Sequence, residues 1–212
     1  MMQEAGQTAD VLVIGAGMAG LIAAAELQRA GRRVLVLDKR RGVGGRLASR
    51  RIGAATFDHG AQFITARTSR FAALVDDGRR AGVVEEWHRG SAGRPEGHVR
   101  WRGHPAMTSV AKHLARGLEI MLETRVVALR ASRHRWSAET AAGAYSAGAE
   151  VRTFQVHGWL YSKPLQVDER PCAMVGQGPP LVLAGDAFAG PRVEGAALSG
   201  WATAEAVLAV WS

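Results

Sequence analysis

The N-terminal part of the chain alternates short apolar runs with a segment of helical composition. Val11–Ile14 and Val34–Leu37 are uninterrupted runs of strand-forming residues, which predicts two strands that are buried on both faces. Between them, Leu21–Arg29 is rich in Ala and Leu, which favours a helix, and Gly31 follows as a helix stop. This succession of strand, glycine turn, helix and strand predicts a βαβ unit with a right-handed crossover.

The rest of the chain carries further apolar patterns, some with helical spacing and some typical of strands. Helical spacing or composition predicts helices at residues 67–80, 105–116 and 194–211. Strands are expected at residues 99–102, 118–122, 124–130, 151–161 and 181–184, with extended segments at 52–57 and 61–65. We expect the runs at 10–14, 33–37, 125–130 and 181–184 to form one mostly parallel sheet, with 52–65 beside a bound ligand.

A glycine pattern follows the first predicted strand. In Gly15-x-Gly17-x-x-Gly20, the first glycine allows the tight turn, the second lets a pyrophosphate approach, and the third permits close helix–strand packing. Ala19 lies in the same turn, and the N–H groups of the following helix can hold phosphate oxygens. Asp38 ends the next strand, where an acid accepts hydrogen bonds from an adenosine ribose. These features predict a dinucleotide site.

The residues after that strand resemble a known family. The segment Asp38-Lys39-Arg40-Arg41-Gly42-Val43-Gly44-Gly45-Arg46 resembles a stretch of the flavoproteins of the amine-oxidase and renalase superfamily. The resemblance implies that the cofactor is FAD, that Asp38 and Lys39 belong to its site, and that Gly44, Gly45 and Arg46 reach its pyrophosphate. A guanidinium that donates two hydrogen bonds to phosphate gives a physical reason for Arg46.

Further segments are similar to motifs of the same family. They are Phe57–Thr65 with Gly60, Ala61, Gln62 and Phe63; Trp101–Arg116; Thr124–Leu129 with Val126; and Gly185–Asp186 with Glu194, Gly195 and Ala196. The resemblance implies that Phe57–Thr65 runs beside the flavin, that the Val126 backbone meets the adenine, and that Asp186 contacts the ribityl or phosphate region. It also implies that the helix starting near Glu194 points its N-terminus at the flavin ring, where its dipole favours the reduced anionic form.

The chain departs from the family pattern in one region. Family members carry a large substrate domain where this chain has residues 137–150, a low-complexity run of small residues that resembles a linker. We therefore expect residues 1–136 and 151–212 to form one discontinuous FAD-binding domain, with residues 137–150 replacing most of the substrate domain. Apolar surface near Trp159, Leu160 and Tyr161 would then be exposed, which favours self-association.

Composition limits the function classes. The chain has 212 residues, 47% of them hydrophobic and 22% charged, and a net charge of +8 that comes mainly from scattered arginines. No nucleic-acid motif accompanies these charges, so we expect no nucleic-acid partner. Cys172 is the only cysteine and the histidines lack metal-site spacing, so we expect neither a disulfide nor a metal centre. The charge-free run Val11–Ala25 is too short to cross a bilayer, and residues 1–10 lack the basic residues of a secretory signal, so a cytoplasmic location is expected.

Two functional hypotheses remain, with a third that explains less. The first is an FAD-dependent oxidoreductase that accepts a hydride from a small reduced substrate, of the amine or dihydronicotinamide type, and is reoxidised by oxygen or another acceptor. The flavin supplies the reactivity, so no catalytic side chain is assigned. The second is a degenerate flavin- or nucleotide-binding protein without turnover. A plain NAD-binding Rossmann domain would leave Gly44–Arg46 and Gly185–Asp186 unexplained.

Overall fold

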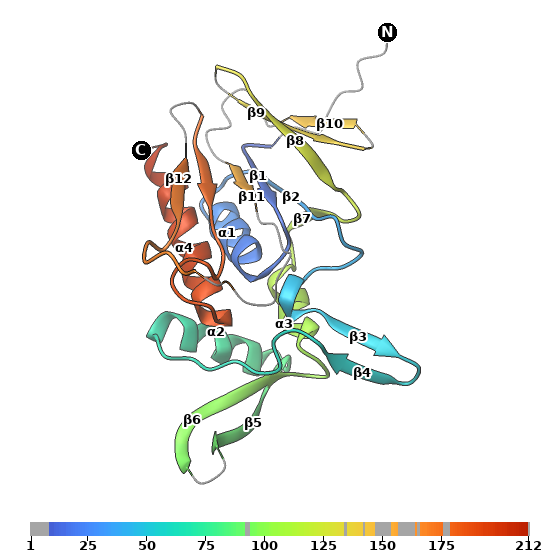
Figure 1. Cartoon of the computed structure of the whole chain (residues 1–212), viewed down its shortest axis with the longest axis vertical. Helices are drawn as coiled ribbons and strands as arrows, with labels where there is room; N and C mark the ends of the chain where they lie inside the picture. Colours follow the sequence, from blue (N-terminus) through green and yellow to red (C-terminus); the bar gives the residue numbers. More distant parts are fainter. Residues whose placement is uncertain are drawn as a thin grey trace.

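The computed structural model describes residues 9–91, 94–133, 135–141, 143–146, 154–156, 164, 166–175 and 179–211 (Figure 1). Its helices are α1 (Met18–Arg29), α2 (Ser69–Arg80), α3 (Thr108–Leu114) and α4 (Val193–Ala209), with one 3₁₀ turn, η1 (Gly45–Leu47). Its strands are β1 (Val11–Ile14), β2 (Val34–Leu37), β3 (Ser49–Ile52), β4 (Ala55–Asp58), β5 (Val84–Ser91), β6 (Arg94–Gly103), β7 (Glu119–Met121), β8 (Val126–Ala131), β9 (Trp136–Thr140), β10 (Gly143–Ser146), β11 (Phe154–Val156), β12 (Ala173–Val175) and β13 (Leu181–Leu183). No helix in these ranges is long and apolar enough to span a membrane.

The centre of the fold is a four-stranded parallel sheet with the order β11-β1-β2-β7. β1 and β2 pair in register from Val11 opposite Val34 to Ile14 opposite Leu37. Both strands are almost entirely buried, as their uninterrupted apolar runs predict. The β1–α1–β2 unit is therefore confirmed, and the fold is an α/β fold of the Rossmann type with a parallel sheet.

Two different layers cover the faces of this sheet (Figure 1). On one face, valines of β1 and β2 pack in the main core with apolar side chains of α1 and α4, such as Leu21 and Trp201. On the other face, Leu12, Leu35 and Leu37 form a second core with Ala138 of β9. Because both faces are covered, the sheet can consist of apolar residues throughout.

The expected membership of the parallel sheet is wrong for two of its four runs. The run at 125–130 falls in β8 (Val126–Ala131), which pairs antiparallel with β9, and the run at 181–184 contains β13 (Leu181–Leu183), which pairs antiparallel with β12. β8 has half-buried and exposed positions and none that is fully buried, with Val127 62% exposed, as in a strand that is partly in solvent. The outer places of the parallel sheet belong instead to β7 and β11.

The expectation of a linker at residues 137–150 is also wrong where the structure describes this segment. Residues 136–146 contain β9 and β10, which pair from Ser137 opposite Ser146 to Thr140 opposite Gly143. The small side chain of Ala138 is fully buried against the parallel sheet, so the small residues here allow close packing of two sheets. Residues 147–150 and Trp159, Leu160 and Tyr161, where an exposed apolar surface was expected, lie outside the described residues.

The remaining elements follow the sequence with shifted boundaries. The helix expected at 67–80 is α2, and the one expected at 105–116 is the shorter α3, which begins at Thr108. The β3–β4 hairpin supplies the acceptors for the start of α3: Asp58 Oδ1 accepts from Met107 N at 3.0 Å, and Ser49 Oγ accepts from Thr108 N at 3.1 Å. The long β5–β6 hairpin extends well beyond the strand expected at 99–102.

Helices α1 and α4 pack in direct backbone contact. A Cβ at Gly200 of α4 would lie 2.5 Å from the carbonyl oxygen of Ala19 and 3.0 Å from Cβ of Ile22. This close approach sets the position of α4, and therefore of the loop before it, relative to the start of α1.

We predict that Gly200→Ala destabilises the protein because a backbone oxygen cannot move aside as a side-chain end can. Overpacking of this kind costs roughly 1–3 kcal/mol, which outweighs the gain of about 1 kcal/mol that alanine brings to a helix over glycine. Urea unfolding measures the effect. Gly42→Ala is the control, since a Cβ at exposed Gly42 meets no atom within 4 Å; an equal stability of both variants would contradict the packing argument.

Candidate functional site

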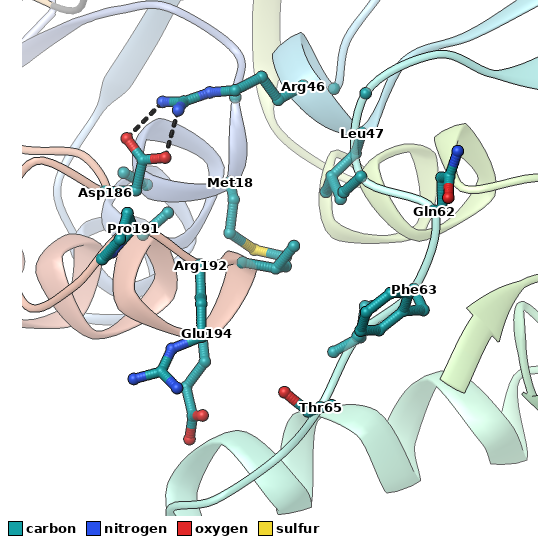
Figure 2. Close-up of a pocket in the computed structure, with 18 of the residues that line it drawn as sticks. Met18, Arg46, Leu47, Gln62, Phe63, Thr65, Asp186, Pro191, Arg192 and Glu194 are labelled. Atoms are coloured by element: carbon teal, nitrogen blue, oxygen red, sulfur yellow. Dashed lines mark hydrogen bonds and ion pairs between the residues drawn. The ribbon is translucent and has the colours of Figure 1, made fainter. Parts of the chain in front are cut away.

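A cleft of about 650 Å³ opens above the start of α1 (Figure 2). Four stretches that are distant in sequence line it: the Gly15–Gly20 turn, residues 44–47 at η1, residues 59–67, and residues 185–196 at the start of α4. Residues of the β5–β6 hairpin close one side. The volume lies in the range of small-molecule and cofactor sites.

The Gly15–Gly20 turn presents the N-terminus of α1 to the cleft. The N-cap Gly17 makes no side-chain cap, and no acidic residue lies in the first turn of α1. A Cβ at Gly17 would meet no atom within 4 Å, whereas one at Gly20 would lie 2.0 Å from the carbonyl oxygen of Gly15. The turn is therefore tightly packed on the protein side and open on the cleft side, and its N–H groups can donate to an anion.

Asp38 holds this turn from behind. Its Oδ2 accepts a hydrogen bond from Ala16 N at 2.6 Å, and its Oδ1 accepts from Arg40 N at 2.8 Å. The residue is 8% exposed and does not line the cleft. Asp38 thus has a structural role that joins the ends of β1 and β2. Each carboxylate oxygen has a second lone pair, so these bonds leave capacity for a ribose hydroxyl.

The η1 turn brings Arg46 into the cleft opposite Asp186. Gly44 N donates to Ala16 O at 2.7 Å, which ties this turn to the glycine turn. The Arg46 guanidinium donates hydrogen bonds from both of its terminal nitrogens to the Asp186 carboxylate, with Nη2 at 2.6 Å from Oδ1 (Figure 2). Burial lowers the pKa of Arg46 to about 10 although Asp186 opposes this shift, so the side chain stays cationic at neutral pH.

The segment after β4 forms a second wall. Ala61 N donates to Arg46 O at 2.8 Å, and Ile64 exchanges backbone hydrogen bonds of 2.7 and 2.9 Å with Trp101 of β6. The Arg100 guanidinium lies 4.6 Å from the centre of the Phe63 ring. The β5–β6 hairpin therefore fixes this segment and adds Arg100 to the cleft.

Glu194 at the start of α4 joins this helix to α2. Its Oε1 accepts hydrogen bonds from Arg67 N at 3.0 Å, Thr68 N at 2.7 Å and Thr68 Oγ1 at 2.8 Å. Thr68 is the N-cap of α2, so Glu194 completes the capping of that helix. Glu194 is 4% exposed, and this oxygen is used within the protein.

The structure brings most of the predicted site residues together. Those that line the cleft are Gly15, Gly17, Ala19, Gly20, Gly44, Arg46, Gly60, Ala61, Gln62, Phe63, Gly185, Asp186, Glu194 and Ala196. Those outside the lining are Asp38, Lys39, Gly45, Val126 and Gly195. Their contacts with a cofactor stay predictions.

Sequence reasoning missed several lining residues, among them Met18, Leu47, Arg67, His98, Arg100 and Arg192, whereas His59 and Thr65 lie in the segment Phe57–Thr65 that was expected beside the flavin. Arg67 and Arg192 stand next to motifs that were recognised. Nothing in the sequence pattern indicated His98 and Arg100, because they belong to a hairpin that the apolar pattern predicted only in part. No group of three or more His, Cys, Asp or Glu is placed to hold a metal in the described part of the chain.

The fold and the cleft define a dinucleotide-binding protein of the Rossmann type. The family model described as "NAD(P)-binding Rossmann-like domain" matches residues 13–77, which is less than half of the chain. The match covers β1, α1, β2, Arg46 and the wall at residues 59–67, and it ends before the β5–β6 hairpin.

Two curated proteins are similar to this chain over a short segment. A putrescine oxidase of Kocuria rosea is 47% identical over 68 residues, which are 32% of this chain and 14% of that protein. A "Putative flavin-containing monoamine oxidase" of Mycobacterium tuberculosis is 51% identical over 57 residues, 27% of this chain and 13% of that protein. The matched segment is thus a small part of each relative.

Solved structures share the fold over a longer stretch. A putrescine oxidase variant superposes with a TM-score of 0.57 at 15% identity, covering 77% of this chain and 58% of that chain. The THI4 protein of Thermovibrio ammonificans superposes with a TM-score of 0.60 at 16% identity, covering 96% of this chain and 90% of that chain. At these identities the likeness shows the fold alone.

The cleft suits a dinucleotide, and the sequence resemblance implies FAD. The residues present fit that group, because the uncapped start of α1 and the open space at Gly17 can take a pyrophosphate. Arg46 stands across from them and remains cationic when buried.

We predict that Glu194→Ala lowers the free energy of unfolding by roughly 1.5–3 kcal/mol, since donors at the start of α2 lose a charged acceptor. Glu194→Gln keeps one acceptor oxygen and should lose less. Glu205→Ala on the same helix removes only an exposed ion pair with Arg70, 2.7 Å long, and should change stability by less than about 1 kcal/mol. Thermal and urea unfolding of the three variants compare these effects; equal losses for Glu194→Ala and Glu205→Ala would contradict the capping role.

Proposed function

We propose that this chain is an FAD-dependent oxidoreductase that accepts a hydride from a small reduced substrate and returns the electrons to oxygen or another acceptor. The observation that carries the proposal is the convergence of four distant stretches on one cleft at the start of α1. Two of them, the Gly15–Gly20 turn and the Arg46 turn, suit the phosphates of a dinucleotide, and the other two form walls beyond them. Substrates of the amine or dihydronicotinamide type fit the resemblance.

Each predicted residue has a place in this proposal. The start of α1 and Arg46 hold the pyrophosphate, Asp38 and Lys39 lie toward the adenosine ribose, and Val126 lies toward the adenine. Asp186 meets the ribityl arm, and residues 194–196 direct the α4 N-terminus at the ring, where the helix dipole favours added negative charge. Bound FAD supplies the hydride-accepting chemistry, while the chain binds and orients it. Residues 1–136 and 151–212 would share this task as one discontinuous domain.

A second candidate function is flavin or nucleotide binding without turnover. The specific observation that favours it is the exposure of the cleft: His59, Gln62, His98 and Arg192 line it and are solvent-exposed. A site that admits water holds a substrate less selectively than an enclosed one. Both candidates share the cofactor and differ in the reaction.

Absorbance of the purified protein separates these candidates. We expect flavin bands in the protein as purified or after incubation with FAD, and anaerobic bleaching of these bands by a reduced substrate. A flavin-loaded protein that no amine or dihydronicotinamide bleaches would support binding without turnover. A protein that takes up no FAD would contradict both candidates.

We predict that Arg46→Ala weakens FAD binding roughly tenfold to a hundredfold, because a charge-assisted hydrogen bond to phosphate contributes about 1.5–3 kcal/mol. The change also leaves the Asp186 carboxylate, 8% exposed, without its cationic partner and close to the phosphates. The double variant Arg46→Ala/Asp186→Asn removes that charge and should recover part of the affinity. Quenching of flavin fluorescence on binding gives the dissociation constants.

Arg51→Ala is the matched control, since Arg51 lies exposed on β3 and does not line the cleft. Its FAD affinity should equal that of the parent. If Arg46→Ala also binds FAD as tightly as the parent, the assigned role of Arg46 is wrong.

A further inference from the structure

Positive charge is in excess among the described side chains that line the cleft, once the contacts within the protein are taken into account. The described lining contains two acidic side chains, Asp186 and Glu194, and the arginines Arg46, Arg67, Arg100 and Arg192. Which of these charges remain for a ligand depends on the contacts that each one already makes.

Both acidic side chains are engaged within the protein. Asp186 is paired with Arg46 through two hydrogen bonds. Glu194 is buried, and its Oε1 accepts three hydrogen bonds at the start of α2. A cationic amine would find Asp186 already paired with Arg46 and Oε1 of Glu194 already in use, so among the described lining carboxylates only the second oxygen of the buried Glu194 is left to accept from it.

The arginines other than Arg46 are not neutralised in this way. Arg67, Arg100 and Arg192 come from three different elements, and none forms an ion pair with a described residue. The Arg100 guanidinium lies over the Phe63 ring, a contact that uses its face and leaves its N–H donors for an anion. Arg192 points away from the Arg46–Asp186 pair in Figure 2.

Arg100 and Arg192 lie beyond the part of the cleft that suits the dinucleotide phosphates, and Arg67 lines the cleft beside Glu194, whose Oε1 accepts from Arg67 N. The phosphates face the start of α1 and Arg46, whereas Phe63 with Arg100 and the side chain of Arg192 lie toward the other end (Figure 2). Positive charge that gathers in a cleft raises the local concentration of anions and repels cations.

We propose that the substrate of this cleft is a small anion, whose carboxylate or phosphate is held by Arg67, Arg100 and Arg192. This inference rests on the proposed function, which places the cofactor and leaves the substrate class open. It separates the chain from a diamine oxidase, because a diamine such as putrescine carries only positive charge at neutral pH.

Binding of matched ligand pairs tests the proposal, measured by calorimetry on the protein as purified. Ornithine and putrescine differ by a carboxylate, and nicotinamide mononucleotide and nicotinamide riboside differ by a phosphate. In at least one pair, we expect the member that carries the carboxylate or the phosphate to bind roughly tenfold to a hundredfold tighter. The pair that shows the difference identifies which anionic group the cleft prefers.

Arginine variants then locate the anion. Arg67→Gln, Arg100→Gln and Arg192→Gln should each weaken binding of the ligand that carries the carboxylate or phosphate. The three substitutions combined should reduce the preference for that ligand by tenfold or more, with little change in the affinity for the ligand that lacks the group. Arg130→Gln is the control, because Arg130 lies on β8 and pairs with Glu139 away from the cleft. The three arginines are surface-accessible or half-buried, and unfolding curves check that each variant is folded.

Three outcomes would overturn the proposal. The first is tighter binding of putrescine than of ornithine without a phosphate preference. The second is an anion preference that survives the combined arginine variant. The third is a preference that Arg46→Ala alone removes, which would place the anion at the start of α1. Failure of the oxidoreductase proposal is seen separately, as a protein that takes up no flavin or whose bound flavin no substrate bleaches, and the calorimetric comparison does not depend on that result.

Discussion

The close backbone packing around α1 is the constraint on which the rest of the structure depends. Gly20 lets α1 approach the end of β1, where a Cβ would lie 2.0 Å from the Gly15 carbonyl oxygen. Gly200 lets α4 approach α1, because a Cβ at Gly200 would lie 2.5 Å from the Ala19 carbonyl oxygen. Since both contacts involve backbone atoms, the start of α1 and the loop before α4 have little freedom to shift apart. The cleft between them is fixed by this packing.

Polar contacts between distant parts of the chain complete the cleft. Asp38 accepts from Ala16 N and so joins the ends of β1 and β2, while Glu194 joins α4 to the start of α2. The Arg46–Asp186 pair connects the N-terminal unit with the C-terminal part of the chain. Buried carboxylates of this kind need partners, and here the partners are groups that also position the cleft. Acidic side chains in the lining therefore serve the structure first.

Sequence patterns predicted the centre of the fold better than its periphery. Val11–Ile14 and Val34–Leu37 are local signals, because an uninterrupted apolar run between a glycine turn and an acid allows few other structures. The runs at 125–130 and 181–184 look similar, but their neighbours are decided by tertiary pairing, which a single run does not encode. The small residues at 137–146 suggested a linker, although the same residue sizes suit a sheet packed closely on another. In the site, the glycine and arginine motifs marked the phosphate end, whereas Arg100 reaches the cleft only through the β5–β6 hairpin.

The extent of the sequence matches explains why cofactor and substrate have to be argued separately. The match with the Rossmann-like family model ends at residue 77, so it contains the turns that face a dinucleotide and one of the three unpaired arginines, Arg67. Arg100 and Arg192 lie outside it, on the β5–β6 hairpin and on the loop before α4. In this chain, the parts of the cleft that carry these two arginines therefore have no counterpart in the matched segment. The charge of the cleft in this chain therefore carries more weight for its substrate than the names of the proteins that share its first strands.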